Sequence, residues 1–415
     1  MQHMKQLIIF NEASQAANYG IGTYINEIVK LLNKSFKISI IILYSEKTEF
    51  EIVKKKQFCE MYIPKYQEAC NSVNERNEYM KNVFYLIHPL VNQNEELLFH
   101  FNYTTESSVY YLSKIFFPKS KTILIVHYLH WCFLIKGNTS MFREIIHRDN
   151  NQLYNNIENE VLALYRKELF HFNSVDSIFT LSEYTNNLLI SEYKISSKKI
   201  FFMRNGLKDV YQANLIDRKT KIKDSLLFSK DSYIILFVGR LNKVKGLDYL
   251  INSFKFVIKK IKSAQLVIIG DGDYNEFLKD CKGFGNKILF LGRMEKDELH
   301  NYFQIADIGV MPSFHEQCSY VAIEMMMNSL PIIGSTSTGL KEMIVDGETG
   351  LHIPIIERSD CVDIDTSLLA EKILYLLQNP EERKRMGVNA RKRYEQMYSS
   401  EIMKKKLLNF YNSLI

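Results

Sequence analysis

The stretch YIILFVGRLNKVKGLDYLINSFKFVIKK, residues 233–260, contains the structural unit that recurs along the chain. The run YIILFVG is apolar and predicts a buried β-strand, because strands covered on both faces are continuously hydrophobic. A polar loop follows, and residues 247–260 then place apolar side chains at helical spacing. The stretch therefore predicts one strand–loop–helix unit of an α/β protein.

The same pattern recurs on both sides of this stretch. Further apolar runs predict strands at 5–10, 38–44, 97–101, 122–127, 177–182, 199–203, 264–270, 287–292, 307–312, 330–334 and 349–354. Strands that alternate with helices predict doubly wound parallel sheets. A chain of 415 residues exceeds the ~250–300 residues at which single cores stop growing, so two domains are expected. The polar segment 214–231 is interpreted as the linker region. We expect Rossmann-like domains over 1–210 and 211–395.

Composition and charge exclude several classes of protein. The net charge of +6 is small for this length and is not concentrated in a basic domain, which argues against nucleic-acid binding. Short lysine clusters are more often solvated faces than contacts to anionic lipid. The six cysteines form no CxxC pair, so reduced thiols are expected and neither a disulfide framework nor a zinc site. With no apolar run long enough to span a bilayer, we expect a cytoplasmic protein with at most a peripheral contact to the membrane.

Two basic residues bracket the loop after the quoted strand. Arg240 follows YIILFVG, and Lys245 stands just before the next helix. Ligands of open α/β sheets bind beyond the carboxyl ends of the strands, and a helix N-terminus favours anions. Arg240 and Lys245 are therefore candidates for holding a diphosphate. The alternative is that both are simply exposed loop residues.

A pair of glutamates follows the strand at 307–312. Glu316 and Glu324 lie eight positions apart in HEQCSYVAIE, and a helix is expected to begin near Ser319. On one continuous helix the two side chains would not converge, because eight residues rise by about 12 Å. If Glu316 precedes the helix, the two carboxylates can contact different parts of one ligand. The apolar neighbours of Glu324 predict a buried carboxylate that needs donors, such as ribose hydroxyls or a structural partner.

Candidate residues in the first half are supported by weaker patterns. Gly20 and Gly22 precede a helix, where glycines let a backbone approach a phosphate or sugar. His127 ends a strand and is either a ligand contact or a structural hydrogen-bonding residue. The long connection 128–156 is the best candidate acceptor surface, where an aromatic side chain either stacks on a sugar or fills a local core. Its candidate residues are His130, Trp131 and Arg143.

Two acidic doublets raise the question of a metal. Asp271 and Asp273 follow one strand, and Asp363 and Asp365 precede a helix. We interpret both doublets as turns whose aspartates cap helices, because Arg240 and Lys245 already supply the positive charge that a diphosphate needs. No metal and no other cofactor are expected.

Taken together, these motifs resemble retaining glycosyltransferase family 4 (GT-B fold, glycosyl transferases group 1). The resemblance is strongest over 230–355, in FVGRLNKVKGLDYLINSF, LVIIGDGDYNEFL and the segment from PSFHEQ to TGLHIP. It implies that the two domains face a central cleft and that a final helix, 396–415, crosses back to the first domain. It also implies transfer of a sugar, typically a hexose, from a nucleotide-diphosphate sugar with retention and without a metal.

The resemblance also implies individual roles. The diphosphate would be held by Arg240 and Lys245, the donor sugar by Glu316 and the ribose by Glu324, with His127 near the reacting carbon. The remaining implied donor contacts are Gly20, Gly22, Gly239, Gly270, Gln317, Cys318 and Ser319. This sequence departs from the family where Gln317, Cys318 and Ser319 replace a glycine-rich run, and where Ser329 replaces a usual glycine. Those departures leave the identity of the donor open.

The acceptor is not defined by the sequence. A glycan, a lipid-linked glycan and a peptide all remain open as acceptors. The alternative to an active transferase is a non-catalytic GT-B subunit that assists a glycosylation complex. Such subunits typically lose the diphosphate-binding cations, whereas this chain keeps Arg240 and Lys245.

Overall fold

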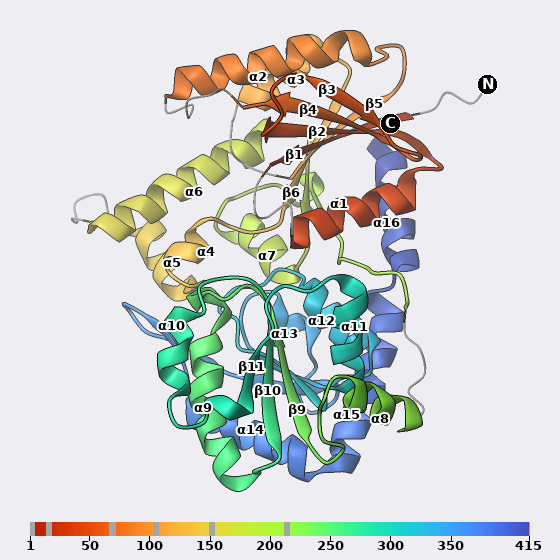
Figure 1. Cartoon of the computed structure of the whole chain (residues 1–415). Coiled ribbons are helices and arrows are strands. Elements are labelled where there is room, and N and C mark those ends of the chain that lie inside the picture. Colours follow the sequence, from red (N-terminus) through yellow and green to blue (C-terminus); the bar gives the residue numbers. More distant parts are fainter. Residues whose placement is uncertain are drawn as a thin grey trace. The chain divides into compact units, whose positions relative to one another are not determined.

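The computed structural model describes residues 5–13, 19–65, 72–102, 108–148, 154–210 and 216–414 (Figure 1). The chain folds into two compact units. The first unit comprises Met1–Leu129, Tyr154–Asn205 and Ser400–Ile415, and the second comprises His130–Leu153 and Gly206–Ser399. Each unit is built on its own largely parallel sheet. The expectation of two doubly wound α/β domains is confirmed.

The first unit contains an eight-stranded sheet in the order β3-β4-β2-β1-β5-β6-β7-β8. Its neighbouring strands pair in parallel except β3 with β4, which are antiparallel. The strands are β1 (Lys5–Glu12), β2 (Phe36–Ser45), β3 (Glu51–Lys54), β4 (Cys59–Pro64), β5 (Leu97–Phe101), β6 (Lys121–Val126), β7 (Ser177–Thr180) and β8 (Ile200–Phe202). The strands β3 and β4 are not predicted from sequence, because both are only partly buried and neither carries a sustained apolar run.

Helices cover this sheet. They are α1 (Gly20–Leu32), α2 (Val73–Ile87), α3 (Ser108–Phe116), α6 (Asn156–Ser174), α7 (Glu183–Ser191) and α16 (Ser400–Leu414). The last helix lies beside α1, at the opposite end of the sequence (Figure 1). Tyr411 of α16 is fully buried, and its hydroxyl lies 2.7 Å from Nδ1 of His100 on β5. The final helix is therefore part of the core of the first unit.

The second unit contains a six-stranded parallel sheet in the order β11-β10-β9-β12-β13-β14. The strands are β9 (Tyr233–Val238), β10 (Ala264–Ile269), β11 (Ile288–Phe290), β12 (Ile308–Met311), β13 (Ile332–Ser335) and β14 (Gly350–Ile353). The chain starts at β9, adds strands on one side, and then continues from β12 on the other. The boundary between β9 and β12 is thus the point at which strand order reverses.

The second unit also contains helices and a small antiparallel hairpin. A buried cluster that includes Leu250, Phe254, Val257, Leu369 and Ile373 joins α9 and α14 to the sheet. The longer helices are α8 (Ile216–Ser225), α9 (Leu247–Lys260), α11 (Lys296–Ile305), α12 (Tyr320–Met327), α14 (Thr366–Gln378) and α15 (Pro380–Met397). A separate antiparallel hairpin pairs β15 (Ile355–Glu357) with β16 (Val362–Ile364). The last two elements of this unit are thus the helices α14 and α15.

A helix that spans a membrane must be both long and apolar. None of the helices within the described ranges combines the length and the apolar content that a membrane-spanning segment needs.

The segment interpreted as a linker contains helix α8. Lys219 pairs with Asp307 at 3.0 Å, beside the start of β12. Lys223 is buried and donates to the carbonyl oxygen of Ser232 at 2.6 Å. These contacts attach α8 to the second unit, although its polar composition resembles a linker.

The connection after β6 folds against the second unit. We call residues 130–148 the insertion; it contains α4 (Trp131–Leu134) and α5 (Thr139–His147). Its Asn138 is 1% exposed, and Nδ2 donates to the carbonyl oxygen of Arg358 at 2.7 Å, while Oδ1 accepts from the Met141 amide at 2.9 Å. The Glu357 carboxylate accepts from the amides of Thr139 and Ser140 at 3.1 Å each. The insertion is therefore bonded to the β15–β16 hairpin, whereas its place in the sequence suggests the first domain.

We expect Asn138→Ala to destabilise the protein by about 1–2 kcal/mol, because it removes the side chain that caps α5 and the hydrogen bond to the Arg358 carbonyl. Urea unfolding at pH 7.5 measures the change. Asn173→Ala is the matched control, since Asn173 is exposed and donates to Leu169 within its own helix. Equal unfolding midpoints for the two variants would show that the insertion is not held by Asn138.

Candidate active site

The loops that follow β9 and β12 lie at the point where strand order reverses in the second sheet. Ligands of open α/β sheets bind beyond the carboxyl ends of the strands at such a point. The two loops are bonded to each other, because the Phe314 amide donates to the Val244 carbonyl at 2.8 Å. Gly246 begins α9 with φ +66°, and a Cβ there would collide with the carbonyl oxygen of Pro312. A glycine is therefore required for the two loops to pack this closely.

Lys245 and Glu316 meet across these loops. The Lys245 Nζ lies 2.5 Å from the Glu316 Oε1, and the two side chains are 18% and 12% exposed. Ion pairs that are largely withdrawn from water are screened little by salt. The two residues that the sequence motifs associate with diphosphate and sugar are thus direct neighbours.

The backbone of Glu316 is fixed by the loop after β13. The Glu316 amide donates to the Thr338 hydroxyl at 3.0 Å, and that hydroxyl donates to the Glu316 carbonyl at 2.5 Å. The Gly339 amide donates to the same carbonyl at 2.8 Å. Glu316 precedes α12, whose first turn is capped by the Ser319 side chain, as expected. Thr338 is not among the residues predicted from sequence, because nothing in STSTG distinguishes the threonine that faces Glu316.

Glu324 lies in the middle of α12 and is only half-buried. In the described part of the chain no hydrogen bond or ion pair reaches its carboxylate, although the sequence pattern predicts donors there. Burial raises the pKa of Glu324 from its ordinary 4.5 to about 7, and Lys296 opposes the shift. A half-buried carboxylate with a raised pKa is suited to accept hydrogen bonds from the hydroxyls of a ligand.

Arg240 is half-buried directly after β9. The two glycines at the ends of the neighbouring strands, Gly239 and Gly270, lie against each other. The Gly239 amide donates to the Ile269 carbonyl at 3.0 Å, and a Cβ on Gly270 would collide with the Gly239 carbonyl oxygen. Glycine at 270 is therefore needed for the backbones to approach beside Arg240.

The run that departs from the family pattern is buried. Gln317, Cys318 and Ser319 are 5%, 6% and 9% exposed. The preceding His315 is buried as well, which lowers its pKa to about 3, with a smaller contribution from the charge of Lys245. Ser329 adopts φ +57°, the left-handed conformation that glycine prefers after a helix. The side chains at 317–319 are therefore largely buried, and that of Ser319 caps α12.

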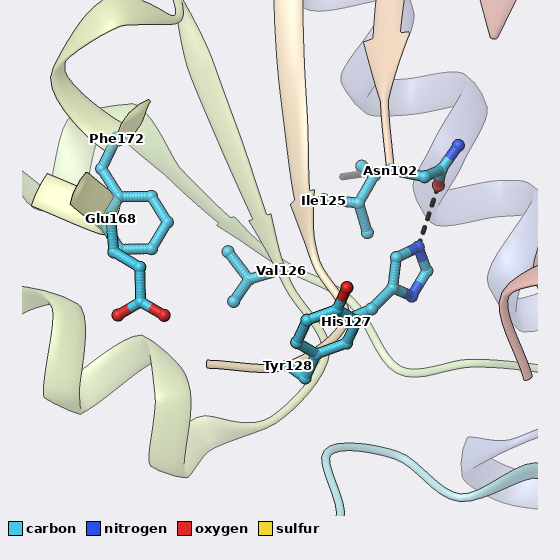
Figure 2. Close-up of a pocket in the computed structure, with 7 residues that line it drawn as sticks. All are labelled: Asn102, Ile125, Val126, His127, Tyr128, Glu168 and Phe172. Atoms are coloured by element: carbon cyan, nitrogen blue, oxygen red, sulfur yellow. Dashed lines mark hydrogen bonds between the residues drawn. The ribbon is translucent and has the colours of Figure 1, made fainter. Parts of the chain in front are cut away.

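The first unit contains the other candidates. Gly20 and Gly22 lie in the first turn of α1, and among the described residues no atom lies within 4 Å of a Cβ built on Gly20. His127 follows β6 and lines a small pocket (Figure 2). Its Nε2 lies 2.9 Å from Oδ1 of Asn102, and the ring of Tyr24 packs edge-on against it at 4.8 Å. Burial lowers the pKa of His127 to about 3, so its imidazole is neutral near pH 7.

The acceptor-side candidates lie in the insertion. Trp131 is fully buried and stacks on Phe142 at 4.0 Å, which makes it part of a local core in this structure. His130 is half-buried and Arg143 is exposed. All three belong to the second unit, whereas His127 belongs to the first.

The acidic doublets lie in turns beside helices. Asp365 caps α14 through the amides of Ser367 and Leu368, as expected. The Asp273 carboxylate accepts from the Asn275 amide at 2.9 Å, although α10 (Asn275–Leu278) begins one residue later than an aspartate cap requires. These two aspartates therefore act on backbone amides of their own turns.

Comparison with known proteins gives consistent matches. Residues 218–393 match the Glycosyl transferases group 1 family. An uncharacterized glycosyltransferase of Methanocaldococcus jannaschii is 30% identical over 46% of this chain and 50% of its own length. The capsular polysaccharide biosynthesis glycosyltransferase CapM of Staphylococcus aureus is 28% identical over 61% of this chain and 66% of its own. These matches thus span half to two thirds of the relatives.

A solved structure extends the likeness to the whole fold. Anabaena HepE, crystallised with UDP and glucose, superposes with a TM-score of 0.74 at 12% identity and covers 99% of this chain and 100% of its own. At this identity the likeness concerns the fold.

Proposed function

We propose that this protein transfers a sugar from a nucleotide-diphosphate sugar to an acceptor hydroxyl, because residues 218–393 match the Glycosyl transferases group 1 family. The two parallel-sheet units have the GT-B fold of such enzymes. The observation that carries the proposal is the Lys245–Glu316 pair at the reversal point of the second sheet. It offers a cation and a carboxylate side by side where ligands of α/β sheets bind.

The donor is proposed to lie along the carboxyl ends of β9 and β12. Lys245 and Arg240 neutralise the diphosphate, Glu316 accepts hydrogen bonds from the sugar hydroxyls, and Glu324 accepts from the ribose. Gly239 and Gly270 permit close backbone approach there, and residues 317–319 are proposed to contact the donor sugar through their backbone amides. Gly20 and Gly22 are proposed to approach the diphosphate from α1. Two cations suffice for the diphosphate charge, so the reaction proceeds without a metal.

The proposed reaction transfers a hexose with retention at the anomeric carbon. The bond from that carbon to the diphosphate oxygen breaks, and a bond to the acceptor oxygen forms on the same face. The acceptor proton passes to the leaving phosphate. Charge grows on the phosphate as the bond breaks, so Lys245 and Arg240 stabilise the transition state more than the ground state. His127 accepts a hydrogen bond from a sugar hydroxyl near the reacting carbon.

The acceptor is proposed to be a glycan or a lipid-linked glycan. CapM is named for capsular polysaccharide biosynthesis, which supports this class over a peptide. His130 and Arg143, which are not fully buried, are the proposed acceptor contacts of the insertion. We place the protein in the cytoplasm, with a peripheral contact at the membrane if the acceptor is lipid-linked.

The test is release of nucleoside diphosphate from nucleotide sugars. UDP-, GDP-, ADP- and dTDP-sugars are incubated with the purified protein, and slow hydrolysis of one donor is expected even without acceptor. Glu316→Ala and Arg240→Ala should each abolish that release. Undiminished release by both variants would contradict the assignment, and no release from any donor would favour a non-catalytic GT-B subunit.

A further inference from the structure

His127 has two ring nitrogens, and one of them forms a hydrogen bond within the protein. Nε2 is bonded to Asn102, which directly follows β5 and is 2% exposed. Nδ1 has no hydrogen-bond partner in the described part of the chain and points away from Asn102 (Figure 2). The chemistry that His127 can offer a ligand therefore depends on which nitrogen carries the proton.

The backbone of β1 determines the orientation of the Asn102 amide. Asn102 Nδ2 donates to the carbonyl oxygen of Phe10 at 3.1 Å. A carbonyl oxygen accepts only, so the NH₂ group must face Phe10, and the opposite amide orientation would set two acceptors against each other. Oδ1 of Asn102 is then the atom that faces His127.

An amide oxygen likewise accepts only. The nitrogen 2.9 Å from Asn102 Oδ1 must therefore carry a proton, which makes His127 the Nε2–H tautomer. Burial keeps the ring neutral, so Nδ1 holds a lone pair. The proton on His127 is thus fixed through Asn102 by the Phe10 carbonyl.

We propose that Asn102 is a positioning residue that holds His127 in the Nε2–H tautomer and presents Nδ1 as the acceptor for a ligand hydroxyl. That the hydroxyl belongs to a sugar rests on the proposed function. The tautomer of His127 does not rest on the proposed function, because it follows from the hydrogen bonds among Phe10, Asn102 and His127 alone.

Titratable groups surround the ring from several elements. Tyr24 of α1 packs edge-on against it, and Tyr128 and Glu168 line the same pocket (Figure 2). His100 of β5 lies close enough that His127 contributes to the lowering of the His100 pKa, after burial. His100 is bonded to Tyr411 at 2.7 Å. A neighbouring polar bond that does not involve His127 is therefore available as a control.

The direct test is NMR of protein labelled with ¹⁵N-histidine at pH 7.5, because ring ¹⁵N shifts distinguish the two tautomers. The chain has 10 histidines, and His127→Gln assigns the relevant signals. We expect a protonated Nε2 and an unprotonated Nδ1 in the wild type. Asn102→Leu should mix the tautomers, whereas Tyr411→Phe should leave them unchanged. A protonated Nδ1 in the wild type, or an unaltered tautomer in Asn102→Leu, would overturn the proposal.

A kinetic test separates positioning from mere packing. In Asn102→Asp the carboxylate should raise the pKa of His127 and favour the imidazolium, which has no lone pair at Nδ1. Donor turnover at pH 6 should then fall by about 10-fold relative to the wild type and recover by about pH 9. Equal loss at every pH would overturn the positioning role. An Nε2–H tautomer in a protein that turns over no donor would contradict the proposed function and leave the positioning intact.

Discussion

Lys245→Ala is expected to lower kcat/KM for the nucleotide sugar by about 100- to 1,000-fold, the usual effect of removing one preorganised charge-stabilising group. Two effects add. The cation that stabilises the leaving diphosphate disappears, and the Glu316 carboxylate, 12% exposed, loses its partner at 2.5 Å. An unpaired carboxylate then repels the phosphate it adjoins. Steady-state release of nucleoside diphosphate measures the change.

Lys243→Ala is the matched control, because it removes the same charge two residues away in the same loop. Lys243 is exposed, so its loss should change kcat/KM by less than about 2-fold. Circular dichroism establishes that both variants are folded. Equal kinetic losses in the two variants would mean that general charge near the loop, and not the pair with Glu316, determines turnover.

Glu324→Gln is expected to have opposite effects on binding and on stability. A carboxylate that accepts hydroxyl hydrogen bonds binds them more strongly than an amide does, so nucleotide affinity should fall by about 10-fold or more. The ligand-free protein should become more stable at pH 8 by on the order of 2 kcal/mol, because a half-buried charge is removed. Titration calorimetry and urea unfolding measure the two effects.

The free energy of unfolding of Glu324→Gln should depend on pH differently from that of the wild type. The folded pKa of Glu324, about 7, lies above its ordinary 4.5, so the folded state binds the proton more tightly. Protonation of Glu324 therefore stabilises the folded state fully below about pH 4.5, and this stabilisation is lost as the pH rises through 7. Glu324→Gln should remove this loss, whereas Glu371→Gln, at an exposed position of α14, should not. Parallel pH profiles for both variants would contradict a raised pKa at Glu324.

The strands of both sheets could be predicted from sequence because parallel strands are buried on both faces. The runs LIIF (7–10) and YIILFVG (233–239) are continuously apolar for that reason. Strand β3, at the edge of its sheet, and its neighbour β4 lack this signal, because β3 has no buried residue and β4 has two. Helix α8 escapes prediction for a related reason: its sequence, IDRKTKIKDS, is polar and shows no apolar stripe.

The site was only partly predictable. Strand ends identify Lys245 and Glu316 as candidates, but their pairing depends on β9 and β12 being neighbours in the sheet. Thr338 and Asn102 act through hydrogen bonds between segments that are distant in the sequence, and no local spacing encodes such contacts. The position of the insertion after β6 suggests the first domain, whereas the bonds of Asn138 lead to the β15–β16 hairpin.

The central claim is that the second unit binds a nucleotide-diphosphate sugar through Lys245 and Glu316. A thermal-shift screen of the wild type and Lys245→Ala with UDP-, GDP-, ADP- and dTDP-sugars tests it most directly, since a ligand that binds the native state must raise Tm. We expect the sugars of one nucleotide to raise the Tm of the wild type in a dose-dependent way. The Tm of Lys245→Ala should stay nearly unchanged. No shift with any of the four, or equal shifts in both proteins, would contradict the claim.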